Sequence, residues 1–170
     1  ADSVLKRMAR RCKTAEFARL VETARASVPD FNFTTDIIVG FPGETDGEWR
    51  QTLAFVERMG FGHLHIFAFS PRAGTRAADM PDPVPENVKR ARSRALHALG
   101  EQTKQNLLRR YIGRELEVLV EGRNEDSAGP FDAGLAPSYL PVRLRGDTPG
   151  GANRIVPVRI IGLTNDAQAL

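Results

Sequence analysis

Two short loops of this sequence carry side chains that could bind a charged ligand, and each follows a strand-like run. The first is GFPGE, residues 40–44, after the apolar run IIV. Gly40 and Gly43 permit backbone conformations closed to other residues, and Pro42 fixes its own φ, so the chain turns tightly and presents main-chain N–H and C=O groups. Glu44 adds a carboxylate; in the alternative interpretation it only favours the dipole of the next helix.

The second loop is SPRAGT, residues 70–75, after the run HLHIFAF. Arg72 carries a planar guanidinium, which binds a carboxylate or a phosphate through parallel hydrogen bonds. Ser70 and Thr75 are weaker candidates, because hydroxyl groups beside Pro and Gly often only stabilise a turn. The pattern therefore predicts an anion-binding side chain at Arg72.

The other chemically active residues favour structural roles. Asp36 lies within a strand-like run, where an unpaired carboxylate is costly, so its side chain must reach a partner or the mouth of the barrel; a structural ion pair is the favoured role. His63 and His65 share one face of a strand, but without a third ligand they indicate packing or exposure rather than a metal site. Cys12, the sole cysteine, is expected to be a half-buried hydrophobic residue. A single cysteine excludes an internal disulfide and any cluster or zinc site built from several thiolates of this chain.

Helices and strands alternate around the two loops. Thr14 is a plausible N-cap for one helix, and Thr45 and Glu48 form a capping box for the next, which Gly60 ends. The expected elements are helix 14–28, strand 33–39, helix 45–59 and strand 63–70. This order predicts parallel strands joined by crossover helices. Two strands alone do not make a stable sheet, so we expect either a partner chain or a longer protein of which this is a C-terminal piece.

The composition changes after a long helix, which is expected from Glu86 to about Ile112 and ends at Gly113. Its expected buried stripe consists of Val88, Ala91, Ala95 and Leu99 and is continued by Leu107, Leu108 and Tyr111. Three strand-like runs follow, separated by Gly, Pro, Asn and Asp: RELEVLVEG, SYLPVRLRG and NRIVPVRIIG. A domain boundary is therefore expected near Gly113, and the remaining residues suit a small antiparallel barrel or OB-like module.

Composition sets broad limits on function. The chain has 170 residues, 41% of them hydrophobic, which allows one domain or two small ones. No apolar run is long enough to span a bilayer, and no signal-peptide pattern opens the chain. The net charge is +3, the pI is near 9.4, and basic residues gather at 6–13 and 89–114. This favours a polyanionic partner, with a solvated helix face as the alternative.

Longer motifs resemble those of one enzyme family. TTDIIVGFPGET, HLHIFAFSPRAGT with AADMP after it, and NRIVPVRI have the order and spacing found in the C-terminal half of radical-SAM methylthiotransferases. SVLKRMARRC resembles their segment after the fourth barrel strand, where an aromatic residue commonly takes the place of Cys12. The resemblance implies an α/β fold in which residues 1–112 form the C-terminal portion of a partial TIM-like (βα) barrel. Residues 113–170 would form a TRAM domain, a small antiparallel, OB-like β-barrel that binds RNA.

The resemblance also implies cofactors. In this family the loop after the fifth strand lies beside S-adenosylmethionine, which places Gly40, Pro42, Gly43 and Glu44 at that cofactor. Arg72, which follows the sixth strand, is expected to bind the carboxylate of the cofactor's methionine part or a substrate phosphate. The enzymes hold one 4Fe–4S iron–sulfur cluster on a Cys-x3-Cys-x2-Cys motif and carry a second 4Fe–4S cluster. A chain with a single cysteine cannot supply these ligands. We therefore expect a piece of the enzyme that has no metal ligands or catalytic residues of its own and is inactive alone.

The implied reaction adds a methylthio group to C2 of a modified adenosine beside the anticodon. The expected partners are the anticodon stem-loop of tRNA and the missing N-terminal portion of the same protein, in the cytoplasm, with neither a membrane nor DNA. HLHIFAFSPRAGT favours the threonylcarbamoyladenosine branch over the isopentenyladenosine branch. The alternatives are a sister enzyme that modifies a ribosomal-protein aspartate and a non-catalytic RNA-binding module.

A basic surface is expected to hold the RNA. Arg143 and Arg145 are the strongest candidates, because they share one strand face while Val142 and Leu144 face the core. The full set of expected RNA-binding residues is Ser70, Thr75, Arg109, Arg110, Arg114, Arg143, Arg145, Arg154 and Arg159. Contacts of this kind go mostly to phosphates, so the affinity should fall with salt.

Overall fold

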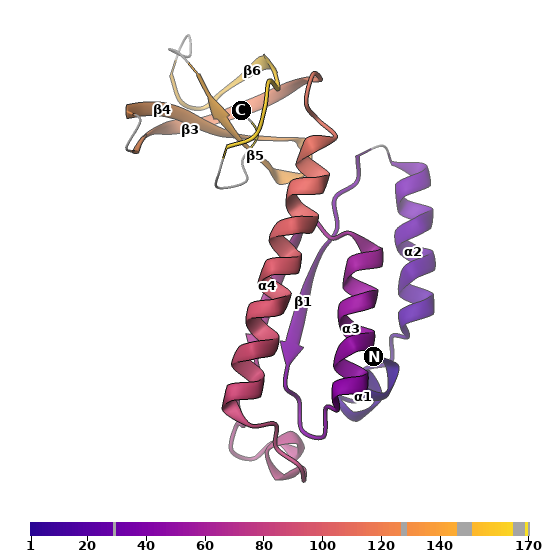
Figure 1. Ribbon diagram of the computed structural model, residues 1–170. Coiled ribbons are helices and arrows are strands. Elements are labelled where there is room, and N and C mark those ends of the chain that lie inside the picture. The colour runs from indigo at the N-terminus through magenta and orange to yellow at the C-terminus, as the bar shows by residue number, and fades with distance from the viewer. Residues whose placement is uncertain (29, 127–128, 146–150, 165–168, 170) are drawn as a thin grey trace. The chain divides into compact units, whose positions relative to one another are not determined.

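The computed structural model describes residues 1–28, 30–126, 129–145, 151–164 and 169 (Figure 1). The chain divides into two compact units, Ala1–Thr103 and Lys104–Leu170. The division falls within helix α4 (Glu86–Arg109), before the position near Gly113 that the sequence analysis suggested. Among the described residues, no helix is both long and apolar enough to cross a membrane.

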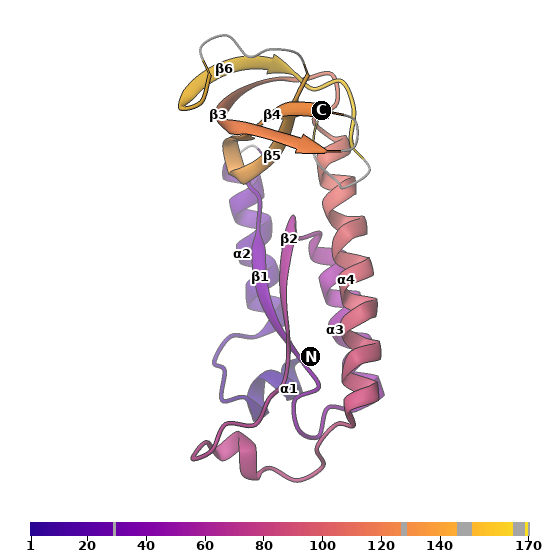
Figure 2. The same ribbon diagram turned by 90° about the vertical axis from the view of Figure 1, so that its left-hand side faces the viewer.

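The first unit contains two parallel strands and the helices that surround them. Its elements are α1 (Asp2–Arg7), α2 (Thr14–Ser27), β1 (Thr34–Val39), α3 (Asp46–Met59), β2 (His63–Ala68), the short 3-10 helix η1 (Arg76–Asp79) and most of α4. Strand β1 pairs with β2 in parallel, from Thr34 opposite His63 to Val39 opposite Ala68. Figure 2 shows the two strands side by side. The predicted order of helices and strands is confirmed, whereas α1 was not predicted.

One face of this sheet packs against helices. Val39 and Leu64 are buried together with Trp49 and Val56 of α3 and Leu96 of α4. The loss of this apolar area from water is the main stabilising contribution of the unit. Figure 1 shows β1 between α3 and α4. No third strand joins this sheet among the residues that the structure describes.

Local capping signals fix the ends of α3. The backbone N–H of Glu48 donates to Thr45 Oγ1 at 3.2 Å, and the N–H of Thr45 donates back to Glu48 Oε2 at 2.9 Å. Gly60 ends the helix in the left-handed conformation, with φ of 57°. The prediction that Thr14 is the N-cap of α2 is wrong: Thr14 is the first helical residue, and its N–H donates to Asp2 Oδ1 at 2.8 Å.

The predicted stripe of α4 is confirmed in part: Leu108 and Tyr111 are buried, and Val88 and Leu99 are half-buried. Ala91 and Ala95 are exposed, whereas Arg92 and Leu96 are buried. The helix ends at Arg109, and a turn leads to Gly113 at φ of 85°.

The second unit is a four-stranded antiparallel sheet in the order β5-β4-β3-β6. The strands are β3 (Glu115–Asp126), β4 (Gly129–Ala136), β5 (Leu140–Leu144) and β6 (Arg154–Arg159), with η2 (Pro137–Tyr139) between β4 and β5. The three predicted strand-like runs correspond to β3, β5 and β6, and β4 was missed. The described strands do not close a barrel, although Ala169 forms isolated bridges with Val142 and Leu163.

Strand β4 exists because its glycine lets two backbones approach. A Cβ atom on Gly134 would lie 2.3 Å from the carbonyl oxygen of Leu119 in β3. The core of the unit joins Leu108 and Tyr111, at and beyond the end of α4, to Val118, Val142 and Ile160. The close approach at Gly134 accounts for a strand in a stretch rich in Gly, Pro and Asp, which have low strand propensity.

Candidate ligand-binding site at the strand ends

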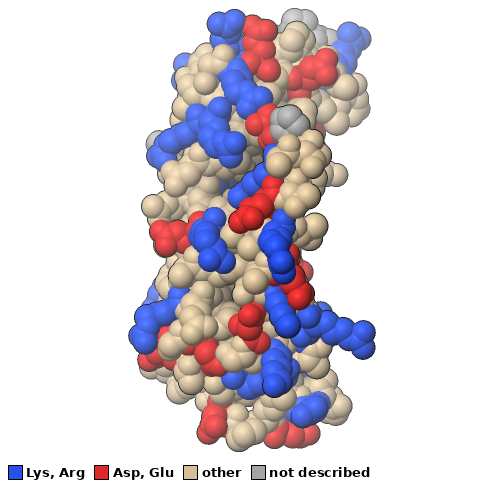
Figure 3. All heavy atoms as spheres, turned by 90° about the vertical axis from the view of Figure 1, so that its right-hand side faces the viewer, with Lys and Arg blue, Asp and Glu red and all other residues tan. Residues whose placement is uncertain are grey.

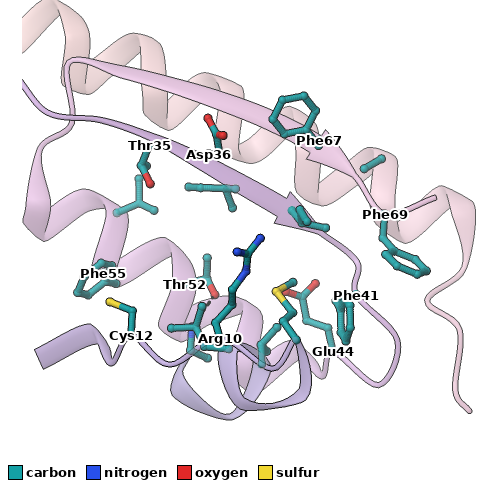
Figure 4. A pocket seen from close by; sticks show the side chains of 18 of the residues that line it. Arg10, Cys12, Thr35, Asp36, Phe41, Glu44, Thr52, Phe55, Phe67 and Phe69 are labelled. Carbon is teal, nitrogen blue, oxygen red and sulfur yellow. Dashed lines mark hydrogen bonds between the residues drawn. The ribbon is translucent and has the colours of Figure 1, made fainter. Parts of the chain in front are cut away.

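A pocket of about 1070 Å³ lies along β1 in the first unit (Figure 4). One part is apolar and is lined by α1, α2 and α3, with Leu5, Phe17 and Phe55 among its residues. The other part lies where the carboxyl ends of the two strands lead into their loops, and Glu44 and Arg72 line it. Ligands bind at this end of parallel strands in open and closed α/β sheets.

The apolar part follows the outer edge of β1. Five consecutive residues, Thr34, Thr35, Asp36, Ile37 and Ile38, line the pocket. Neighbouring residues of a strand point to opposite faces, so a cavity touched by all five lies beside the strand rather than over one face. Its volume exceeds the roughly 300–1,000 Å³ of ordinary ligand sites. The pocket therefore runs along the outer edge of β1 and reaches the strand ends.

The loop after β1 is held closely by its own carboxylate. Gly40 and Gly43 both have φ of 73°, as the tight turn predicted. The N–H of Gly40 donates to Glu44 Oε2 at 2.9 Å, and the guanidinium of Arg92 donates to the same oxygen at 2.8 Å. Glu44 lines the pocket, whereas Gly40, Pro42 and Gly43 are not among the residues that line it.

The loop after β2 brings a guanidinium to the same part of the pocket. Arg72, Ser70 and Thr75 all line it and are exposed. The hydroxyl of Thr75 donates to the carbonyl oxygen of Arg72 at 2.7 Å, so Thr75 also stabilises the turn. The rings of Phe41 and Phe69, one from each loop, meet edge to face with centroids 5.2 Å apart. The two predicted loops thus come together at one site.

Two expectations for residues near this site are wrong. Asp36 is exposed on β1 and makes no ion pair among the described residues, because its side chain lies in the open pocket rather than in the core. Cys12 is exposed rather than half-buried, because it lies in the segment between α1 and α2, and it lines the pocket. From the same segment Arg10, which the sequence analysis did not single out for this site, extends toward β1 (Figure 4).

The two strand histidines lie together without a metal-binding set. The rings of His63 and His65 are 4.6 Å apart, and Asp36 is opposite His65 in the strand register. In the part of the chain that the structure describes, no three histidine, cysteine or acidic side chains are placed to hold a metal ion.

Several arginines proposed for RNA contact already have protein partners. Arg143 pairs with Asp126, and its guanidinium lies 3.8 Å from the centroid of the Phe131 ring. Arg159 pairs with Glu115 at 2.6 Å. The predicted inward orientation of the neighbours of Arg143 is confirmed, because Val142 and Leu144 are 2% and 8% exposed.

The remaining arginines of the set differ in their contacts. Arg109 donates to Asn106 Oδ1 at 2.9 Å, and Arg114 lies 4.9 Å from the centroid of the Tyr111 ring. Arg110, Arg145 and Arg154 are exposed. In Figure 3 basic side chains are interspersed with acidic ones on the face shown.

Comparison with known proteins identifies the family. No family model matches the chain. The chain is 47% identical over 121 residues, 71% of its length, to the threonylcarbamoyladenosine tRNA methylthiotransferase MtaB of Thermotoga maritima. It is 43% identical over 160 residues, 92% of its length, to a tRNA-2-methylthio-N(6)-dimethylallyladenosine synthase of Chloroflexus aurantiacus, and 37% identical over 168 residues, 98% of its length, to that of Bartonella bacilliformis. The chain belongs to the radical-SAM methylthiotransferase family.

The chain spans about a third of the length of these curated relatives: 28%, 30% and 36%. Its donor set does not fit an iron–sulfur cluster, because clusters of this kind are held by several cysteine thiolates and this chain has one cysteine. The residues at the strand ends are of a different chemical type: a carboxylate, a guanidinium and aromatic rings.

Proposed function

We propose that this chain is the C-terminal part of a cytoplasmic tRNA-modifying enzyme that adds a methylthio group to C2 of a modified adenosine beside the anticodon. The observation that carries the proposal is the 47% identity to a threonylcarbamoyladenosine tRNA methylthiotransferase over 71% of the chain. The rest of the enzyme, including the cysteines that hold its clusters, would lie in a preceding portion of the same protein. The outer edge of β1 supports this, because no strand pairs with it among the described residues and an apolar groove runs beside it.

S-adenosylmethionine fits the side chains at the strand ends. Its carboxylate matches the guanidinium of Arg72, its ammonium matches the carboxylate of Glu44, and its adenine matches the rings of Phe41 and Phe69. When bound beside a reduced cluster, the cofactor supplies the radical chemistry of the reaction. The part of this chain is to orient the cofactor and to exclude water from it.

We further propose that the second unit is a TRAM domain that holds the tRNA. The exposed Arg145 and Arg154 are available for phosphate contacts, and Arg143 would exchange its pairing with Asp126 for a phosphate. In the full-length enzyme, the double substitution Arg143→Ala/Arg145→Ala should weaken tRNA binding and reduce its salt dependence. A salt dependence equal to that of the unchanged enzyme would remove RNA binding from this surface.

The proposed activity is tested with the full-length enzyme and two tRNA substrates. One carries threonylcarbamoyladenosine and the other carries dimethylallyladenosine beside the anticodon, and mass spectrometry detects the methylthio product. We expect product from the threonylcarbamoyl substrate. The dimethylallyl substrate is the second candidate, because a relative that acts in that branch by its name aligns over 92% of the chain. Product from neither tRNA would contradict the proposed function.

Cofactor binding is tested by substitution at the pocket. Arg72→Ala removes the proposed carboxylate contact, whereas Arg76→Ala removes an exposed arginine that does not line the pocket. Loss of one charge-assisted hydrogen bond should weaken the binding of S-adenosylmethionine by about 1.5–3 kcal/mol in the first variant only. Equal affinities in the two variants would leave Arg72 without a role in cofactor binding.

A further inference from the structure

Helix α4 contacts both strand-end loops of the pocket through two residues that lie one turn apart. Arg92 reaches the loop after β1: its Nη1 donates to Glu44 Oε2 at 2.8 Å and to the carbonyl oxygen of Glu44 at 3.1 Å. Its Nη2 donates to Asp46 Oδ1 at 2.6 Å. The planar fork thus holds a side chain and the main chain of the same loop.

The pair of Arg92 and Glu44 is buried. Their side chains are 6% and 2% exposed. A buried ion pair contributes little net stability, because desolvation of both charges opposes their attraction, but removal of one partner leaves the other charge unpaired. Since Glu44 Oε2 also accepts the N–H of Gly40, one carboxylate oxygen joins the start of the loop to the helix. The arrangement therefore fixes geometry more than it adds stability.

Lys89, the second of these residues, contacts both loops. Its ammonium donates to the carbonyl oxygen of Phe69, in the loop after β2, at 3.1 Å. Its Cγ lies 2.3 Å from the place that a Cβ on Gly40 would occupy, so the aliphatic part of Lys89 packs against the loop after β1. Each of the two loops carries one of the phenylalanine rings, Phe41 and Phe69, that meet at the pocket.

We propose that Arg92 is a positioning residue for the cofactor pocket. It acts through Glu44: by fixing this carboxylate, it fixes residues 40–46 and the direction in which Phe41 and Glu44 face the pocket. Lys89 supports the second loop in the same way. This inference rests on the proposed function, because S-adenosylmethionine is the ligand whose binding reports the position of the loop.

The test uses the full-length enzyme with Arg92→Met, Arg92→Lys and, as a matched control, Arg94→Met, which changes an exposed arginine of the same helix. We expect the dissociation constant of S-adenosylmethionine, measured by equilibrium dialysis, to rise about tenfold in Arg92→Met. The Gly40 amide should exchange with solvent about tenfold faster. Arg92→Lys should restore part of both, and the control should change neither. If Arg92→Met lowers the free energy of unfolding but leaves the dissociation constant of S-adenosylmethionine unchanged, the proposal is overturned.

A double substitution keeps the test valid if Arg92→Met fails to fold. Glu44→Gln/Arg92→Met removes both buried charges and leaves no buried ion unpaired, because Asp46, the other partner of Arg92, is 78% exposed. If Arg92 acts through Glu44, the double variant should bind the cofactor as weakly as Glu44→Gln alone. Additive losses would overturn the proposal. If the unchanged enzyme binds no cofactor while Arg92→Met still accelerates exchange at Gly40, the positioning is supported and only the proposed function fails.

Discussion

Substitution of Gly40 by alanine should damage the first unit in a way that can be separated from backbone strain. Gly40 and Gly74 have similar positive φ angles, 73° and 77°. An alanine in the left-handed region therefore costs about 1–2 kcal/mol at either position. Only at Gly40 does the added methyl group meet a neighbour, the Cγ of Lys89 at 2.3 Å, whereas nothing lies within 4 Å at Gly74.

The difference between the two variants measures this contact. Overpacking of this kind costs about 1–3 kcal/mol, so Gly40→Ala should lower the free energy of unfolding by that much more than Gly74→Ala does. Urea unfolding followed by the fluorescence of Trp49 reports on the correct unit, because the chain has one tryptophan and it is buried in α3. When Lys89 is also replaced by alanine, Gly40→Ala and Gly74→Ala should lower the free energy of unfolding by the same amount. If Gly40→Ala and Gly74→Ala lower the free energy of unfolding equally while Lys89 is present, the reasoning is refuted.

Three further outcomes are expected. Arg7 holds the pKa of Glu48 well below its ordinary value of 4.5, so the stability from this pair is present above pH 4.5 and is lost as the pH falls further. Glu48→Gln should therefore lower the free energy of unfolding by about 2 kcal/mol at pH 7. If the difference in free energy between the variant and the unchanged protein stays constant down to pH 3, the pair does not stabilise the fold. Gly134→Ala should destabilise the second unit by about 3 kcal/mol, because the added methyl group meets a backbone oxygen at 2.3 Å. Gly122→Ala should not, because nothing lies within 4 Å of its added methyl group. Equal melting curves for the two variants would contradict this. Anaerobic reconstitution with iron and sulfide should leave this chain without a stoichiometric cluster, because Cys12 is its only thiol, and a cluster spectrum on the monomer would be the contrary result.

The parts of the fold that the sequence predicted have short-range causes. Thr45, Glu48 and Gly60 determine the ends of α3 through bonds within a few residues, and these were read correctly. Strand β4 has no such signal. It forms because Gly134 allows β3 to come close, which is a contact between strands and not a property of the segment.

The site shows the same division. Glu44 and Arg72 follow strand-like runs, so their meeting at one pocket could be predicted from the order of elements. Arg92 could not, because it is 48 residues from Glu44 in the chain and has the composition of a solvated helix face. One signal was available: Arg92 is four residues from both Val88 and Leu96, which places it on the same face of α4.

The outer edges of the two sheets have different consequences for the chain when it is produced by itself. Strand β6 carries Pro157, which has no N–H to offer to an added strand. The edge of β1, in the run TTDIIV, has neither a proline nor a lysine, the residues with which proteins commonly protect such edges. A fragment of the protein without a strand beside β1 would therefore expose this edge to other copies of itself. Its yield on expression should be limited by aggregation through the first unit rather than through the second.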